Sequence, residues 1–220
     1  IRTNLEFFFT NKPEGKGKKI FVTSTYPKEG KTFISVNLAT ILAQTDKKVL
    51  LMGLDIRNPK ISEYTTTPTK GITNYISSKE KVVLKDYIYP SGIAANFDVL
   101  PAGIIPPNPS ELLMSKALEN LLAEIEDIYD YIVVDTAPIS LVTDTTLIAK
   151  YADAFLYVTR ANYLDRRMIP YIEKLYSDQN LPSMSVLVND TEVSTTYGYG
   201  YGYGYGTQVE KKSFLKRIFK

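Results

Sequence analysis

The residues best suited to chemistry are Gly30, Lys31 and Thr32, which follow a short apolar, β-branched segment at 19–24. This triplet is the core of a Walker A loop, in which backbone N–H groups at the start of a helix hold phosphates. Lys31 would reach the β- and γ-phosphates of a nucleotide, and the Thr32 hydroxyl would bind Mg²⁺. The standard pattern has a glycine at position 25, where this chain has Thr25, so a plain turn between strand and helix is the alternative.

Asp135 ends another apolar segment, YIVVDTAP at 131–138. An aspartate in that place is typical of a Walker B motif, which supplies the acid near Mg²⁺, although an aspartate after a strand also caps helices. Further residues are expected to contact the nucleotide. The predicted nucleotide contacts are Glu29, Gly30, Lys31, Thr32, Phe33 and Asn189.

The composition narrows the chemistry further. The 220 residues include no cysteine and no histidine, which excludes disulfides, thiolate or imidazole metal sites and histidine-based catalysis. The remaining side chains suit phosphoryl transfer, where positioning and a hard cation matter most. A net charge of +2 does not indicate a nucleic-acid partner. No apolar run predicts a membrane span, and the start at Ile1 indicates a soluble piece of a longer chain.

The elements that must position these residues alternate along the chain. Short apolar runs predict strands at 19–24, 48–54, 96–103, 131–138, 152–160 and 183–190. Helical patterns are found at 30–44, within 109–128, at 143–150 and at 167–177, and residues 1–9 read as the end of a helix. This alternation predicts an α/β fold with a doubly wound, mostly parallel sheet and helices on both faces, as in P-loop NTPases. Ligands of such sheets bind beyond the carboxyl ends of the strands, where every candidate motif lies.

Several segments together resemble the bacterial tyrosine kinases (BY-kinases) of capsule and exopolysaccharide export. Leu50–Pro59 (LLMGLDIRNP) is similar to their Walker A′ motif, in which an apolar strand leads into Asp-x-Asp-x-Arg. Ser24–Thr32 (STYPKEGKT) resembles their phosphate loop, and Gly103–Leu113 (GIIPPNPSELL) resembles their Gly-x-x-Pro-Pro-Asn-Pro-x-Glu-Leu-Leu stretch. Arg2–Phe7 looks like the end of their N-terminal Glu-x-x-Arg-x-x-Arg oligomerisation helix. The resemblance covers essentially the whole chain.

The resemblance implies ATP as phosphoryl donor and Mg²⁺ as cofactor, with Mg²⁺ held by Thr32, Asp55 and Asp135. It implies catalytic roles for Lys31, Asp55, Asp135 and Arg57. Gly53 departs from the family pattern, because it stands where the first acid of Asp-x-Asp-x-Arg is usual. Asp55 must then hold Mg²⁺, activate the tyrosine, or do both. Arg57 could orient Asp55 or contact a phosphate, and a surface salt bridge is the alternative.

After residue 190 the composition changes, so we expect a kinase domain at 1–190 and a flexible tail at 191–220. Five tail tyrosines alternate with glycine, which suits threading into a narrow site better than packing as a strand. The resemblance makes them phosphoacceptors: Tyr197, Tyr199, Tyr201, Tyr203 and Tyr205. A low-complexity adhesive segment is the alternative. The basic, apolar end at 211–220 could lie on an anionic membrane surface or remain solvated.

The resemblance further implies an autophosphorylating kinase that acts between subunits and regulates polysaccharide polymerisation and export. Its expected partners are further copies in a ring while unphosphorylated, a membrane activator or co-polymerase segment, and a tyrosine phosphatase. It would work at the cytoplasmic face of the plasma membrane. Two other functions fit the loop: a deviant-Walker ATPase switch and a degenerate nucleotide-binding scaffold. Tyr26 stands where such ATPases usually carry a second lysine, which counts against the switch, and Gly53 gives the scaffold some weight.

Overall fold

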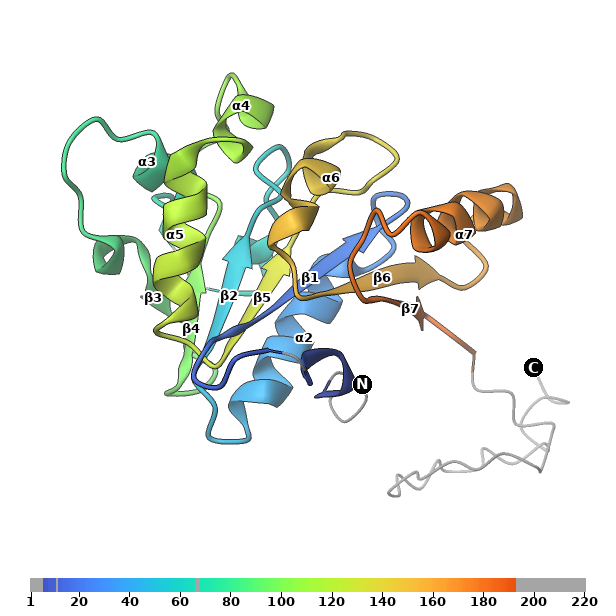
Figure 1. Cartoon of the computed structure of the whole chain (residues 1–220), viewed down its shortest axis with the longest axis horizontal. Helices are drawn as coiled ribbons and strands as arrows, with labels where there is room; N and C mark the ends of the chain where they lie inside the picture. The colour runs from blue at the N-terminus through green and yellow to red at the C-terminus, as the bar shows by residue number, and fades with distance from the viewer. Residues whose placement is uncertain (1–5, 11, 66–67, 193–220) are drawn as a thin grey trace, which may run out of the picture.

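The computed structural model describes residues 6–10, 12–65 and 68–192. A twisted sheet of seven strands forms its centre, in the order β3-β4-β2-β5-β1-β6-β7 (Figure 1). Every neighbouring pair is parallel except β3 with β4. The strands are β1 (Lys18–Ser24), β2 (Val49–Gly53), β3 (Tyr89–Pro90), β4 (Phe97–Leu100), β5 (Tyr131–Asp135), β6 (Ala154–Arg160) and β7 (Met184–Asn189). The doubly wound, mostly parallel sheet is confirmed, and only the two-residue β3 was not predicted.

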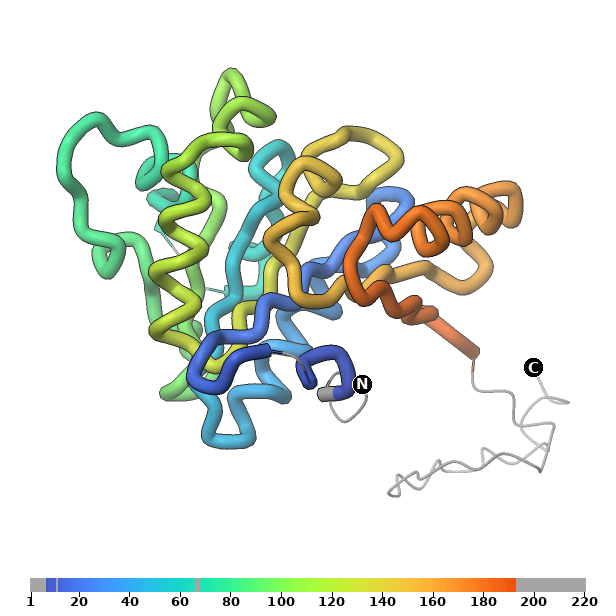
Figure 2. Tube along the Cα trace, viewed as in Figure 1, coloured from blue at the N-terminus to red at the C-terminus, as the bar shows by residue number. Residues whose placement is uncertain are grey.

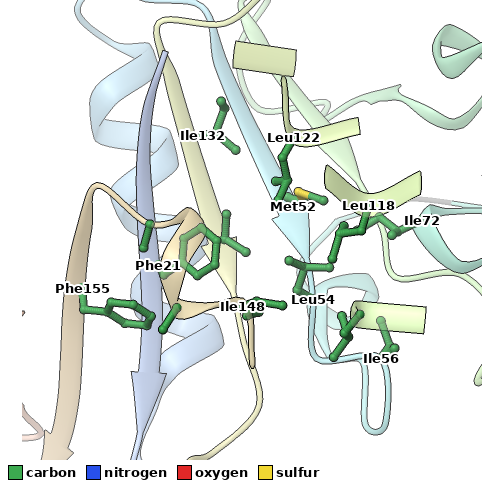
Figure 3. Packing of buried hydrophobic residues seen from close by; sticks show 14 of the residues in the cluster. Phe21, Met52, Leu54, Ile56, Ile72, Leu118, Leu122, Ile132, Ile148 and Phe155 are labelled. Atoms are coloured by element: carbon green, nitrogen blue, oxygen red, sulfur yellow. The ribbon is translucent and has the colours of Figure 1, made fainter. Parts of the chain in front are cut away.

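The middle residues of the central strands are apolar because both faces of the sheet are covered. Every residue of β2 and β5 is buried. One face packs against α2 (Lys31–Ala43), through residues such as Leu38 and Leu42. The other face packs against α5 (Lys116–Glu126), α6 (Asp144–Ile148) and α7 (Ile169–Ser177). Figure 3 shows part of that cluster around Phe21, Met52 and Leu122.

Several helices are shorter than their sequence patterns predicted. The helical stretch at 109–128 forms two helices, α4 (Pro109–Leu113) and α5 (Lys116–Glu126). Ser115 causes the break, because its hydroxyl accepts a hydrogen bond from the Leu118 N–H and caps α5. The remaining helices are α3 (Ile72–Ile76), α6 (Asp144–Ile148) and α7 (Ile169–Ser177), with 3₁₀ turns at Glu6–Phe9, Ile61–Glu63, Leu84–Tyr87, Ala149–Tyr151 and Arg166–Met168. Residues 1–5 of the predicted first helix lie outside the described residues.

The register of the sheet places the ends of β2 and β5 side by side. Asp135 at the end of β5 lies beside Val22 of β1 and Gly53 of β2. Beyond the strand, the backbone N–H groups of Leu54 and Asp55 both donate to the Asp135 carbonyl, at 2.8 and 3.0 Å. Asp55 and Asp135 are therefore held at one edge of the sheet, as expected for a parallel fold.

The path of the chain is simple. Figure 2 shows the described chain starting beneath β6 in that view and leaving the sheet beyond β7. Within the described residues, no helix has the length and apolar character needed to cross a membrane.

Candidate active site

The loop between β1 and α2 has the geometry of a phosphate-binding loop. Gly30 directly precedes α2 and has φ +97°, in the left-handed region that glycine adopts most readily. A Cβ atom there would lie 2.2 Å from the Asn189 Nδ2 atom, so a side chain at this position would collide with the Asn189 amide group. The first turn of α2 carries no acid, and its N-terminus lines a cleft of about 500 Å³. Helix N–H groups facing such a cleft favour an anionic ligand.

Lys31 lies between the two predicted acids. Its Nζ atom is 2.9 Å from Asp55 Oδ2 and 3.8 Å from Asp135 Oδ1, and all three side chains are buried. The other Asp55 oxygen, Oδ1, accepts a hydrogen bond of 3.1 Å from the Asn58 N–H. Burial raises the pKa of Asp135 to about 6, although Lys31 and the Thr32 hydroxyl favour its charged form. The structure thus brings Lys31, Asp55 and Asp135 into one cluster at the head of α2.

The donor set for Mg²⁺ also converges. The Thr32 hydroxyl donates to Asp135 Oδ2 at 2.8 Å. The Ser35 hydroxyl donates to the Lys31 carbonyl at 2.9 Å and approaches Asp135 Oδ1 at 3.4 Å. Among the described residues, no group of three acids or other strong ligands forms a metal cage. Two carboxylates and a hydroxyl nevertheless suit Mg²⁺, which keeps several waters and binds phosphates as well.

Arg57 lines the same cleft, but its guanidinium is directed to Asp144. Nε donates to Asp144 Oδ2 at 2.6 Å, while Nη2 donates to Asp144 Oδ1 at 3.1 Å and to the Ser110 hydroxyl oxygen at 3.0 Å. Asp144 is almost fully buried, so this fork ties the loop after β2 to the starts of α4 and α6. The structure shows neither a contact of Arg57 with Asp55 nor a purely superficial ion pair. A phosphate contact stays a prediction.

Glu29 and Asn189 contact the loop rather than the open cleft. The Glu29 side chain is fully buried, and its Oε2 accepts from the Tyr26 N–H at 2.6 Å. Burial raises the pKa of Glu29. Asn189 Nδ2 donates to the Glu29 carbonyl at 3.0 Å. Both residues therefore stabilise the conformation of the phosphate loop. Phe33, in contrast, is half-exposed and lines the cleft.

Comparison with known proteins agrees with this geometry. The sequence profile described as an AAA domain matches residues 17–181. The chain is 36% identical to the tyrosine-protein kinase CpsD of Streptococcus agalactiae over 202 residues, which are 90% of this chain and 83% of CpsD. The chain belongs to the bacterial tyrosine-kinase family. The chain is also 36% identical to the tyrosine-protein kinase wzc of Salmonella typhimurium. The matched segment covers 73% of this chain but only 22% of wzc.

Solved structures show the same relationship. The kinase domain of the Escherichia coli tyrosine kinase ETK superimposes with a TM-score of 0.74 at 32% identity, covering 92% of this kinase and 78% of the solved ETK domain. The VpsO kinase domain gives 0.73 at 30% identity, covering 86% and 93%. A ParA family ATPase from Chlorobium tepidum shares the fold at 19% identity, with a TM-score of 0.64 over 79% and 74% of the two chains.

The glycine that replaces the usual first acid of the kinase motif is tightly packed. A Cβ atom on Gly53 would lie 3.0 Å from the Ala102 backbone nitrogen and 3.2 Å from Ile61 Cδ1. The end of β2 therefore approaches its neighbours too closely for an added side chain to fit without a shift. Asp55 remains the carboxylate that the motif contributes to the cleft.

Sequence reasoning missed three residues of this kinase site. Ser35 follows Lys31 by four positions, so it lies on the same side of α2, and this spacing was the available signal. Asp144 begins α6, and Ser110 is near the start of α4. Nothing local connects either of them with Arg57. The five predicted phosphoacceptor tyrosines and the basic end lie outside the described residues.

Proposed function

We propose that this kinase transfers the γ-phosphoryl group of ATP to tyrosine hydroxyls, chiefly those of its own tail. The observation that carries the proposal is the position of Lys31, whose ammonium lies between Asp55 and Asp135 at the N-terminus of α2. A loop that offers helix N–H groups, a lysine and two acids can hold the phosphates of a nucleoside triphosphate together with its cation.

The residues divide the work as follows. Lys31 exchanges its carboxylate partners for the β- and γ-phosphate oxygens and neutralises charge there. Thr32, Asp55 and Asp135 would hold Mg²⁺, which neutralises charge on the phosphates when bound. Arg57 keeps its hydrogen bonds to Asp144, and this ion pair fixes the position of the loop after β2. Glu29 and Asn189 stabilise the conformation of the phosphate loop through their hydrogen bonds to its backbone.

The transfer step needs little from a base. The phenolic oxygen of tyrosine bonds to the γ-phosphorus, the bond from that phosphorus to the β–γ bridging oxygen breaks, and ADP leaves. The phenolic proton passes to Asp55, whose Oδ2 becomes available once Lys31 turns to phosphate. Because the transition state is loose, deprotonation need not precede attack. The single carboxylate of Asp55 is therefore sufficient for the transfer, although Gly53 supplies no second one.

The cellular role is also proposed, from the family. Tail phosphorylation would take place between subunits of a ring and would regulate capsule or exopolysaccharide polymerisation and export. Wzc is much longer than this chain, which covers 22% of it, and this supports an activator segment as partner. The site of action would be the cytoplasmic face of the plasma membrane, with a cognate tyrosine phosphatase reversing the modification.

Lys31→Met tests the catalytic proposal, because methionine keeps much of the volume and removes the charge. The wild-type protein, incubated with ATP and Mg²⁺, should acquire phosphotyrosine in the tail by mass spectrometry, and Lys31→Met should acquire none while its circular dichroism is unchanged. Phosphorylation at the wild-type rate in Lys31→Met would refute the site. ATP hydrolysis without phosphotyrosine in the wild type would instead favour the ATPase switch.

A further inference from the structure

Lys28 is a residue of the phosphate loop to which the proposed mechanism gives no role. Its side chain is exposed and lines the nucleotide cleft. Its backbone has φ +68°, in the left-handed region that disfavours residues with a Cβ atom. Glycine adopts this conformation without strain, as Gly30 does two positions further along the loop. The protein thus has a lysine where its backbone favours glycine.

Contacts with a distant segment hold the loop in this conformation. Nη1 of Arg160, at the end of β6, donates to the Lys28 carbonyl at 3.4 Å. The Tyr163 hydroxyl donates to the Pro27 carbonyl at 3.1 Å. Both bonds end on backbone oxygens, so they fix the loop without occupying the Lys28 side chain. A strained residue that its surroundings keep in place is typical of a ligand-binding site.

The charge of Lys28 also differs from the other positive charges that line the cleft. Each of the others has a carboxylate partner: the pairs are Lys31–Asp55, Arg57–Asp144 and Lys60–Glu63, at 2.9, 2.6 and 2.6 Å. Within the part of the chain that the structure describes, Lys28 forms no ion pair. Its ammonium group is therefore available to a ligand in the cleft.

The start of α2 makes such a cation unfavourable until an anion binds. The N-terminus of a helix carries a partial positive charge, and the first turn of α2 contains no acid to offset it. Lys28 lies two residues before the N-cap residue Gly30, so its ammonium and this helix end repel each other. An anion in the cleft removes the repulsion and is attracted by both the helix N–H groups and the ammonium.

We infer that Lys28 is a second lysine of the nucleotide site, whose ammonium binds the phosphate chain of ATP together with Lys31. This inference rests on the proposed function, because it adds a residue to the same site. Lys28 contributes a positive charge to the cleft, whereas Gly53 contributes no negative one. Both features favour a polyphosphate over a neutral or cationic ligand.

The test measures nucleotide binding separately from catalysis. A fluorescent, non-hydrolysable ATP analogue is titrated with the full chain in excess Mg²⁺ at low salt, and tripolyphosphate competes with it, because tripolyphosphate has the phosphates without the base. Lys28→Met should raise the Kd of the analogue and the Ki of tripolyphosphate at least about fivefold, the factor expected for one close charge pair in a solvated site. The effect should shrink at high salt. Lys81→Met is the matched control, since Lys81 is an exposed lysine that does not line the cleft.

Two further variants separate the charge from the backbone. Lys28→Arg should bind the analogue nearly as tightly as wild type, because it keeps the charge. Lys28→Gly should lose affinity as Lys28→Met does, although it should not lower the urea midpoint of unfolding, since glycine relieves the strain. A wild-type Kd in Lys28→Met overturns the assignment, and a wild-type Kd in Lys28→Gly does so as well, because the effect would then lie in the loop conformation. If both variants lose affinity but the wild type forms no phosphotyrosine with ATP, the assignment stands and the proposed function fails.

Discussion

Replacing Asp135 with asparagine should stabilise the metal-free protein while impairing the kinase. Burial raises the pKa of Asp135 from its ordinary value of 3.8 to about 6. At 1.36 kcal/mol per pKa unit, this rise means that holding the charged form costs about 3 kcal/mol above pH 7. Asparagine avoids that cost and can still accept the hydrogen bond from the Thr32 hydroxyl, which is 2.8 Å from Asp135 Oδ2. Lys31 keeps Asp55 as its partner at 2.9 Å.

The pH dependence gives the prediction its sign. The folded pKa of Asp135 lies above the unfolded value, so the folded state binds the extra proton between about pH 4 and pH 6. The contribution to stability is complete below the unfolded pKa and is lost as pH rises through about 6. Asp135→Asn should therefore exceed wild type by about 1–3 kcal/mol at pH 8, and the gap should close toward pH 4.

Urea unfolding followed by circular dichroism measures this difference, in EDTA and without nucleotide, at several pH values. Asp46→Asn is the matched control, because it makes the same chemical change at an exposed site. The rate of phosphotyrosine formation by Asp135→Asn should fall, because Mg²⁺ would lose one of its carboxylate ligands. The reasoning is refuted if Asp135→Asn is less stable than wild type at pH 8, or if the difference between them does not change with pH.

Three more predictions concern the acids and the tail. Asp55→Asn should lower the initial rate of phosphorylation at least as much as Asp135→Asn, because the motif supplies no second carboxylate; near-normal turnover would assign the role elsewhere. Gly53→Asp should lower the free energy of unfolding by about 1–3 kcal/mol and should not raise kcat, because its Cβ would crowd the Ala102 nitrogen at 3.0 Å and its carboxylate would join two buried acids. Gly53→Ala separates these two effects in urea unfolding, and a gain in kcat by Gly53→Asp at wild-type stability would contradict the packing argument. Full phosphorylation of the tail should dissociate oligomers in light scattering at low salt, since five phosphotyrosines add roughly −7 to −10 charges, whereas tail variants with phenylalanine should stay assembled; equal mass in both states would rule out the switch.

Local sequence was sufficient for every strand except the two-residue β3, and for the phosphate loop. An unbroken apolar run can bury both faces only at the centre of a covered sheet, which is why β2 and β5 were predictable. The triplet at 30–32 specifies a loop and a helix start through its own backbone preferences. The break between α4 and α5 was less visible, because a single serine cap decides it within one continuous helical pattern.

Contacts between distant segments depended on the tertiary structure. The sequence by itself determined that Lys31, Asp55 and Asp135 follow strands or begin a helix at one edge of a sheet. Only the register of β2 on β5 decided that Lys31 lies between the two acids, because side-chain distances depend on strand order and pairing. The bond from Arg57 to Asp144 spans 87 positions, and no local pattern encodes a partner so far along the chain. The close packing around Gly53 is likewise set by Ala102 and Ile61, which approach only when the strands and loops have come together.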